Sequence, residues 1–169
     1  EIELINETLY YCMMVQAQYG VSVESDRLGA LLYPLEGDTF ALDMVIKPER
    51  YHEFGIALHV DKELETGYFL RMNPKNQLVA WDMWPRGEQG RYQWQIKGDV
   101  PYQIETARKL PKAEEYRVHI IKEKDICVVY INDEIVLSTR MYNHKDGYAG
   151  IYVVQGDVKL IQYKEKRSE

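Results

Sequence analysis

Aromatic and charged side chains that suit sugar recognition gather in one short stretch of the sequence. Flat apolar rings can cover the C–H face of a sugar, and planar charged groups make directional hydrogen bonds to its hydroxyls. Tryptophans that fill a core, with arginines covering its rim, would give the same composition. The stretch spans fourteen positions and contains Trp81, Trp84, Arg86, Tyr92 and Trp94. The charged residues Asp82, Glu88 and Arg91 are interleaved with them.

No catalytic motif stands out elsewhere in the chain. The sequence has no HExxH motif, no glycine-rich phosphate loop and no GxSxG turn, and its four histidines are scattered. Ser138 and His144 could be arranged as nucleophile and base, but a strand hydroxyl beside Arg140 is more often structural. Independent catalysis is therefore the least favoured function, and no catalytic residue is predicted.

Acidic residues in the segment HVDKELETG offer oxygen ligands of the kind that calcium prefers. Asp61, Glu63 and Glu65 could chelate such an ion, but a solvated acidic loop between two strands is the favoured interpretation. A pair of acids for glycoside hydrolysis must lie roughly 5–10 Å apart across a sugar, which sequence cannot establish. No cofactor or metal is therefore expected.

Composition indicates one domain (1–169) with a hydrophobic core, in which residues 1–27 are either an N-terminal extension or an edge strand. The chain has 169 residues, of which 46% are hydrophobic and 28% charged. Its net charge of -6, without a basic cluster, argues against nucleic acid or an anionic membrane as a partner. Cys12 and Cys127 are expected to be free, buried thiols.

Neither a signal peptide nor an apolar run of membrane-spanning length is found. The start at Glu1 rather than Met suggests a processed or excised piece, so a secreted and a cytoplasmic location both stay open.

The chain is organised around Tyr68–Arg86, which is predicted to form a hairpin with its turn at Pro74-Lys75. This turn would pair Arg71 with Leu78 and leave Arg71 too far from Asp82 for an ion pair unless the strands curl. Period-2 alternation gives two faces. The core face is expected to carry Tyr68, Leu70, Met72, Val79, Trp81 and Met83. The mixed face, where a ligand is expected, carries Phe69, Arg71, Leu78, Ala80, Asp82 and Trp84.

Short strands separated by turn residues continue along the chain and predict an all-β fold. Tyr10–Val15 is predicted to be a strand and Val21–Arg27 a loop. A second hairpin at Asn132-Asp133, with two largely apolar faces, is predicted to lie centrally in its sheet. Closing so many antiparallel strands favours a two-sheet antiparallel jelly-roll sandwich. The remaining predicted strands are Leu28–Leu35, Phe40–Ile46, Phe54–Val60, Trp94–Lys97, Tyr102–Ala107, Tyr116–Lys122, Tyr148–Gln155 and Val158–Tyr163.

Three segments, YFLRMNPKNQLVAWDMWPR, WQIKGDVP and DICVVYINDEIVLSTRMYNHKDGYAGIYVVQGDVKL, resemble the C-terminal β-sandwich of glycoside hydrolase family 32 fructosidases, the invertase and levanase relatives. The Trp84-Pro85-Arg86 corner and the strand end Ser138–Tyr142 carry most of the resemblance. It implies a concanavalin A-like sandwich that packs against a catalytic β-propeller, whose acidic motifs have no match here. Family 66 carbohydrate-binding modules share this sandwich and bind fructans, but their ligand residues cannot be matched individually.

The residues and the resemblance together predict an accessory module, without catalysis of its own, from an enzyme acting on fructans or sucrose-type sugars. Carbohydrate binding and purely structural support of a β-propeller are ranked nearly level. Rings are expected to stack on the sugar and charged groups to bind its hydroxyls. The predicted ligand contacts are Trp84, Arg86, Arg71, Asp82, Arg140 and Tyr142.

Overall fold

The computed structural model describes residues 3–4, 12–17, 20–84 and 102–167, with side chains described for 28–84 and 103–167. Antiparallel strands account for most of these residues, and one 3-10 turn, η1 (Pro74–Asn76), joins β6 to β7. The strands are β1 (Glu3–Leu4), β2 (Cys12–Ala17), β3 (Gly20–Pro34), β4 (Thr39–Arg50), β5 (Glu53–Val60), β6 (Gly67–Asn73), β7 (Leu78–Trp84), β8 (Tyr102–Gln103), β9 (Tyr116–Glu123), β10 (Ile126–Ile131), β11 (Ile135–Arg140) and β12 (Tyr148–Arg167).

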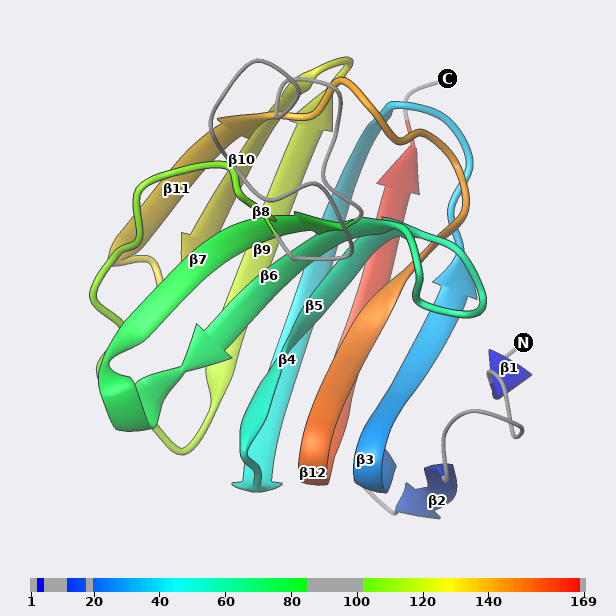
Figure 1. Ribbon diagram of the computed structural model, residues 1–169, viewed down its shortest axis with the longest axis vertical. Helices are drawn as coiled ribbons and strands as arrows, with labels where there is room; N and C mark the ends of the chain where they lie inside the picture. Colours follow the sequence, from blue (N-terminus) through cyan, green and yellow to red (C-terminus); the bar gives the residue numbers. More distant parts are fainter. Residues whose placement is uncertain (1–2, 5–11, 18–19, 85–101, 168–169) are drawn as a thin grey trace.

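Strand β12 connects the two layers of the sandwich (Figure 1). Its first half, up to Val154, pairs with β5 and with the second half of β3. After an irregularity between Val154 and Gly156, its second half pairs with β4 and with the first half of β3. One layer therefore runs β3-β12-β5-β6-β7-β8, and the other runs β12-β4-β9-β10-β11. We call them the β6 layer and the β9 layer.

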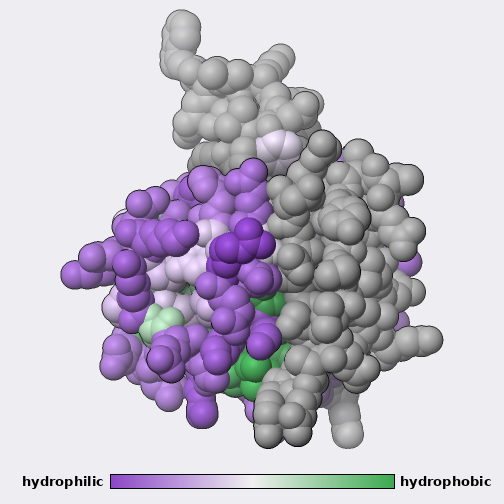
Figure 2. All heavy atoms as spheres, turned by 90° about the horizontal axis from the view of Figure 1, so that it is seen from below, coloured by the Kyte–Doolittle hydropathy of each residue, from purple (hydrophilic) through white to green (hydrophobic). Residues whose placement is uncertain are grey.

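The core lies between these layers because strands of both layers, among them β4, β6 and β9, alternate large apolar residues inward with other residues outward. Strand β4 shows this alternation from Thr39 to Ile46, and β9 shows it throughout. Trp81, which is fully buried, packs in this core as expected. On the face seen in Figure 2, the described side chains are mostly hydrophilic, with hydrophobic ones confined to a small area.

The β6–β7 hairpin confirms both predicted faces but corrects the predicted register. Arg71 pairs with Ala80 and Asn73 with Leu78, two residues from the expected alignment. The reason is the turn: η1 begins after Asn73, whose side chain accepts a bond from the Asn76 N–H, and Gln77 follows in the left-handed region. A two-residue shift preserves the faces, because side chains alternate with period 2.

The β10–β11 hairpin lies at the edge of its layer, so the prediction of a central position is wrong. Asn132 and Asp133 both have positive φ, as predicted, but Ile131 pairs with Ile135 rather than with Glu134. A two-residue turn predicts Val136 and Arg140 on the face of Cys127. The one-residue offset puts Leu137 and Thr139 there instead, so these two are buried whereas Val136 and Arg140 are exposed.

Three other strand predictions need correction. Val21–Arg27 belongs to β3 rather than to a loop, because it pairs with both β2 and β12. The segments Tyr148–Gln155 and Val158–Tyr163 form one strand, since Gln155 takes a positive φ without ending the ladder. Of Tyr102–Ala107 only Tyr102–Gln103 is strand, although Arg108 makes a bridge to Val79. The predicted strand Trp94–Lys97 lies outside the described residues.

Candidate functional site

Small residues hollow the outer face of the β6 layer. Gly55, Ala57 and Ala80 occupy outward positions on β5 and β7, between large inward residues. A Cβ on Gly55 would lie 1.9 Å from the Leu70 carbonyl oxygen and 2.9 Å from the Tyr152 ring. Only glycine therefore lets the Tyr152 ring lie beside this strand.

Larger side chains on the same face line a cavity of ≈ 370 Å³, the β5–β7 pocket. Tyr152 is buried, and its ring meets the Phe69 ring edge-on with centroids 5.6 Å apart. Trp84 is half-buried and adds its indole to the lining. The pocket is lined by Leu28, Glu53, Leu64, Glu65, Phe69, Asp82, Trp84 and Tyr152.

Glu53 and Tyr152 form the first polar pair of the pocket. The Tyr152 hydroxyl donates a hydrogen bond of 3.0 Å to Glu53 Oε1. Burial raises the pKa of Tyr152 well above its usual range, and the negative charge of Glu53 raises it further. The phenol therefore stays protonated, and its hydrogen bond fixes the position of the Glu53 carboxylate at the start of β5.

Arg71 and Asp82 form the second polar pair, which corrects the expectation that they lie too far apart. Arg71 Nε lies 3.4 Å from Asp82 Oδ2. The observed register puts Phe69 opposite Asp82, so Arg71 reaches the carboxylate diagonally across the ladder. Burial raises the pKa of Asp82; the Arg71 charge lowers it, and the Glu53 charge raises it.

This second pair leaves hydrogen-bonding capacity unused. Among the described residues, neither Arg71 Nε nor Asp82 Oδ1 has a hydrogen-bond partner, although both atoms are buried. The side chain of Asp82 is only 12% exposed, so bulk water replaces little of the missing bonding. Buried polar atoms usually find partners, and those that do not call for an explanation such as a ligand.

The charges around the pocket suit a ligand rich in hydroxyl groups. Among the described residues, the carboxylates of Glu53, Glu65 and Asp82 line the pocket and outnumber the one guanidinium group beside them, that of Arg71. Such an excess of acceptors suits hydroxyl donors and repels a ligand that carries its own negative charge. The rings of Phe69 and Trp84 add flat apolar surface next to these polar groups.

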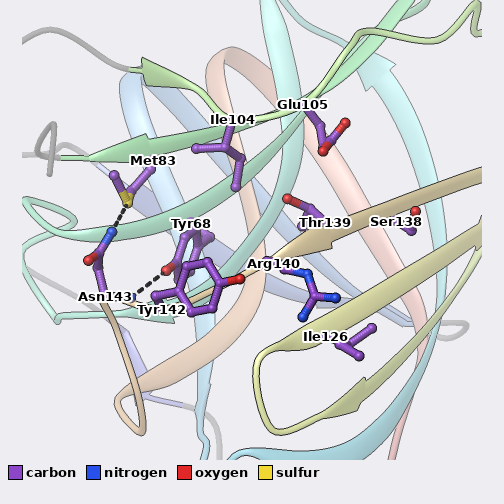
Figure 3. Close-up of a pocket in the computed structure, with 10 residues that line it drawn as sticks. All are labelled: Tyr68, Met83, Ile104, Glu105, Ile126, Ser138, Thr139, Arg140, Tyr142 and Asn143. Atoms are coloured by element: carbon purple, nitrogen blue, oxygen red, sulfur yellow. Dashed lines mark hydrogen bonds between the residues drawn. The ribbon is translucent and has the colours of Figure 1, made fainter. Parts of the chain in front are cut away.

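Arg140 and Tyr142 lie in a different cavity, the β7–β11 pocket, shown in Figure 3. It also measures ≈ 370 Å³ and contains the ends of β7 and β11. Asn143 closes one side, donating from its backbone N–H to the Tyr68 hydroxyl at 3.0 Å and from its side chain to Met83 Sδ. The lining residues are Tyr68, Met83, Ile104, Glu105, Ile126, Ser138, Thr139, Arg140, Tyr142 and Asn143.

The predicted contacts are thus divided between two surfaces. Arg71, Asp82 and Trp84 come together at the β5–β7 pocket, as the mixed face of the hairpin predicted. Arg140 and Tyr142 are exposed at the β7–β11 pocket, which lies on the inward side of β7, where Met83 points. Arg86 lies outside the described residues.

Sequence reasoning missed Glu53 and Tyr152. The predicted strand Phe54–Val60 begins after Glu53, and the sequence gives no partner for the predicted strand that contains Tyr152. Their contact requires the pairing of β12 with β5, in which Tyr152 lies opposite Gly55. The alternation of small with large residues from Phe54 to Leu58 could have indicated a hollow on this face.

The acidic loop after β5 has a structural explanation for its first carboxylate. Asp61 Oδ1 accepts hydrogen bonds from the backbone N–H groups of Glu65 (2.8 Å) and Thr66 (2.9 Å). Asp61 thereby stabilises the turn of this loop. Across the described part of the chain, no group of three or more His, Cys, Asp or Glu side chains is arranged to hold a metal ion.

Cys127 is buried and free, as predicted, and burial raises the pKa of its thiol to about 12. The side chain of Cys12 lies outside those described. Within the described residues no helix has the length and apolar character needed to cross a membrane.

No family model and no curated protein sequence matches this chain. Its fold is similar to carbohydrate-binding module CBM66 from Bacillus subtilis, with a TM-score of 0.77, 17% identity, and coverage of 99% of this chain and 95% of that one. Chicken galectin 2 is similar with a TM-score of 0.54 and 10% identity, covering 83% of this chain and 98% of the other. Alginate lyase A1-II′ of polysaccharide lyase family 7 is similar with a TM-score of 0.52 and 12% identity, covering 92% and 86%. At these identities the likeness concerns the fold, and the chain is an all-β, two-sheet antiparallel jelly-roll sandwich of concanavalin A-like type.

Proposed function

We propose that this chain is a carbohydrate-binding module whose ligand site is the β5–β7 pocket. Arg71, Asp82 and Trp84 are proposed as ligand contacts, joined by Glu53 and Tyr152. The fold supports this proposal, because a structure of the same fold is named a carbohydrate-binding module. The combination of rings and carboxylates in a single pocket, with the guanidinium group of Arg71 held beside one of these carboxylates, supports it independently.

The observation that carries the proposal is the unused bonding capacity of the Arg71–Asp82 pair. Leaving a buried polar atom without a partner costs about 1–3 kcal/mol, and more for a charged group. A sugar hydroxyl can donate to Asp82 Oδ1, and neighbouring hydroxyls can accept from the guanidinium group. Binding would therefore recover energy that the unliganded fold lacks.

The ligand class proposed is a neutral glycan, and within that class a fructan or sucrose-type sugar. Neutrality follows from the excess of carboxylates around the pocket. The narrower choice of fructan rests on the resemblance to the sandwich of family 32 glycoside hydrolases, which also implies that the module comes from such an enzyme. Arg86, Arg140 and Tyr142 remain proposed as further contacts.

Isothermal titration of the 169-residue chain with levan, inulin, sucrose and fructose tests the proposal. We expect heat of binding with at least one of these glycans, and a weaker response to a glycan rich in uronic acids, such as alginate. If none of these glycans gives measurable heat, the binding proposal is wrong. We expect no release of reducing sugar by the isolated chain, and sustained release would instead make it an enzyme.

A second candidate function is support of a neighbouring domain, such as the catalytic β-propeller of a family 32 enzyme. Apolar side chains exposed on the outer face of the β9 layer favour it, because large exposed apolar residues mark interaction surfaces when they cluster. Addition of the separately produced propeller should then give a stable complex by sedimentation, whereas sugars should have no effect. The residues concerned are Ile121 (43% exposed), Ile126 (46%) and Val136 (46%).

A further inference from the structure

A third cavity lies on the outer face of the β9 layer, opposite the core from the β5–β7 pocket. This cavity, the β4–β9 pocket, has a volume of ≈ 240 Å³. Met44 and Val118 at its base point into the core, whereas their strand neighbours point outward into the cavity. The outward side chains are Asp43, Val45, Arg117, His119, Tyr130, Asp133 and Gln162.

The register of four strands explains why these side chains meet. Asp43 on β4 lies opposite His119 on β9, which in turn lies opposite Tyr130 on β10. One step along the ladder, Gln162 on β12 lies opposite Val45, and Val45 lies opposite Arg117. Neighbouring strands are about 4.8 Å apart, so these two rows cross the face over about 14 Å. The result is an extended polar surface with an aromatic end.

His119 and Tyr130 give this surface a ring platform of fixed orientation. Asp43 Oδ1 holds the Nδ1 side of the His119 ring in a short hydrogen bond, so the ring is oriented with Nε2 away from this contact. The Tyr130 ring lies beside it, with centroids 6.2 Å apart and planes inclined by 37°. Tyr130 is 36% exposed, which leaves part of its ring available to a ligand.

The wall formed by the β10–β11 turn is also fixed. Asn132 exchanges two bonds with Arg117: its side-chain oxygen accepts from the Arg117 N–H at 2.8 Å, and its own N–H donates to the Arg117 carbonyl at 2.9 Å. The Glu134 N–H closes the turn by donating to the Ile131 carbonyl. Asp133 is therefore presented from a rigid turn, so that binding requires little ordering of the backbone.

We propose that the β4–β9 pocket is a second carbohydrate-binding site, with Tyr130 and His119 as the stacking surface. Asp43, Arg117, Asp133 and Gln162 supply the donors and acceptors for hydroxyl groups. The choice of carbohydrate as ligand class rests on the proposed function of the β5–β7 pocket. Because the two pockets lie on opposite faces of the sandwich, one module can hold two glycan segments. Simultaneous binding would raise the affinity for a polymer above that for a short oligosaccharide.

Aromatic NMR signals of His119 and Tyr130 test this site separately from the first. The titrant is a short fructo-oligosaccharide, and the proteins are the wild type, Arg71→Ala, Tyr130→Ala and Val136→Ala. Val136 is the matched control, since it lies opposite Tyr130 and is exposed on the same face. We expect the His119 signals to shift in the wild type, in Arg71→Ala and in Val136→Ala. In Tyr130→Ala the affinity at this pocket should fall about 3- to 10-fold.

The outcomes separate the two proposals. If signals near the β5–β7 pocket shift while His119 and Tyr130 do not, the second site is refuted and the first stands. If only His119 and Tyr130 shift, the second site stands and the first fails. If no signal shifts with the oligosaccharide in any protein, both are refuted for this ligand class. Asp43→Asn, which preserves the shape of the pocket, should weaken the His119 response if that ring must be oriented.

Discussion

Two ion pairs of equal length show how differently two regions of this molecule use charge. Arg71–Asp82 at the β5–β7 pocket and Arg50–Asp157 at the start of β12's second half both have a nitrogen–oxygen separation of 3.4 Å. The side chains of the first pair are 32% and 12% exposed, and those of the second are 69% and 36% exposed. Water therefore reaches the second pair more readily than the first, in which Asp82 is the more buried partner. This difference makes the first pair the better candidate for a contact with the proposed ligand.

The same contrast separates the pockets on the two sides of β7. In the β5–β7 pocket Asp82 is held by burial and Glu53 by its bond with Tyr152, although Glu65 is exposed. In the β7–β11 pocket Arg140, Glu105 and Tyr142 are exposed and lie at or just after the ends of strands (Figure 3). A rigid, desolvated group contributes more to binding than an exposed one, because it loses less entropy and competes less with water. Substitutions at the two pockets should therefore have unequal effects.

The largest effect is expected from replacing the glycine that makes room for the Tyr152 ring of the first pocket. Gly55→Ala should lower the free energy of unfolding by about 3 kcal/mol, because the new Cβ meets the Leu70 carbonyl as well as the Tyr152 ring. Gly37→Ala is the matched control, since a Cβ there meets nothing within 4 Å and only the positive φ opposes it. That control should cost about 1–2 kcal/mol. Equal losses in urea denaturation would show that the close approach at Gly55 is not what shapes the pocket.

Acidification should change the free energy of unfolding in opposite directions through the buried histidines and through Asp82. Burial lowers the pKa of His59 from 6.5 to about 4, and it also lowers the pKa of His144, whose ring meets the Tyr68 ring edge-on. The unfolded chain binds a proton at His59 that the folded chain excludes, so stability falls as pH drops from about 6.5 to about 4. For His59 alone the loss is at most about 3 kcal/mol. The pKa of Asp82 is raised in the fold, so its protonation adds stability over an acidic range.

Urea denaturation at several pH values measures these opposing contributions. His59→Asn should flatten the fall in stability between pH 6.5 and pH 4, and asparagine tolerates the positive φ at this position. His52→Asn, at an exposed position, is the control for the substitution itself. A slope that persists in His59→Asn would place the acid sensitivity elsewhere in the molecule.

Removing an arginine side chain should weaken glycan binding more at the β5–β7 pocket than at the β7–β11 pocket. Arg71→Ala should weaken glycan binding by about 2 kcal/mol, or about 30-fold, because it removes a ligand donor and leaves the buried Asp82 without its partner. Arg140→Ala should change the affinity less than about 3-fold, since its exposed group competes with water. Titration calorimetry with the best-bound glycan provides both values. A larger loss in Arg140→Ala would move the principal site to the β7–β11 pocket.

Alternation along single strands predicted much of this arrangement, and pairing between distant strands accounts for what it could not predict. The faces of β6 and β7 follow from period 2, so Trp81 in the core and Asp82 on the outer face were both expected. The ion pair of Arg71 with Asp82 forms because the pairing of β6 with β7 is shifted by two residues from the predicted register, and the η1 turn sets this shift. The Glu53–Tyr152 pair depends on β12 crossing from one layer to the other, a contact between residues 99 apart that no local pattern encodes. The reversed faces of β11 follow from a single extra residue at the Asn132-Asp133 turn.

The smallest expected effect is the most direct test of what the buried charge is for. Asp82→Asn should slightly raise the free energy of unfolding at pH 7, because the raised pKa of Asp82 means that the fold disfavours its charge despite Arg71. The same change should weaken glycan binding, since an amide replaces the acceptor of a hydroxyl bond. Asp157→Asn, at the exposed pair of equal length, should change stability by less than about 0.5 kcal/mol and leave binding unchanged. Thermal unfolding and titration of these two variants measure both properties. A loss of stability in Asp82→Asn would mean that the carboxylate stabilises the sheet. If the carboxylate is instead kept for ligand binding at the expense of stability, the variant should be more stable and should bind more weakly.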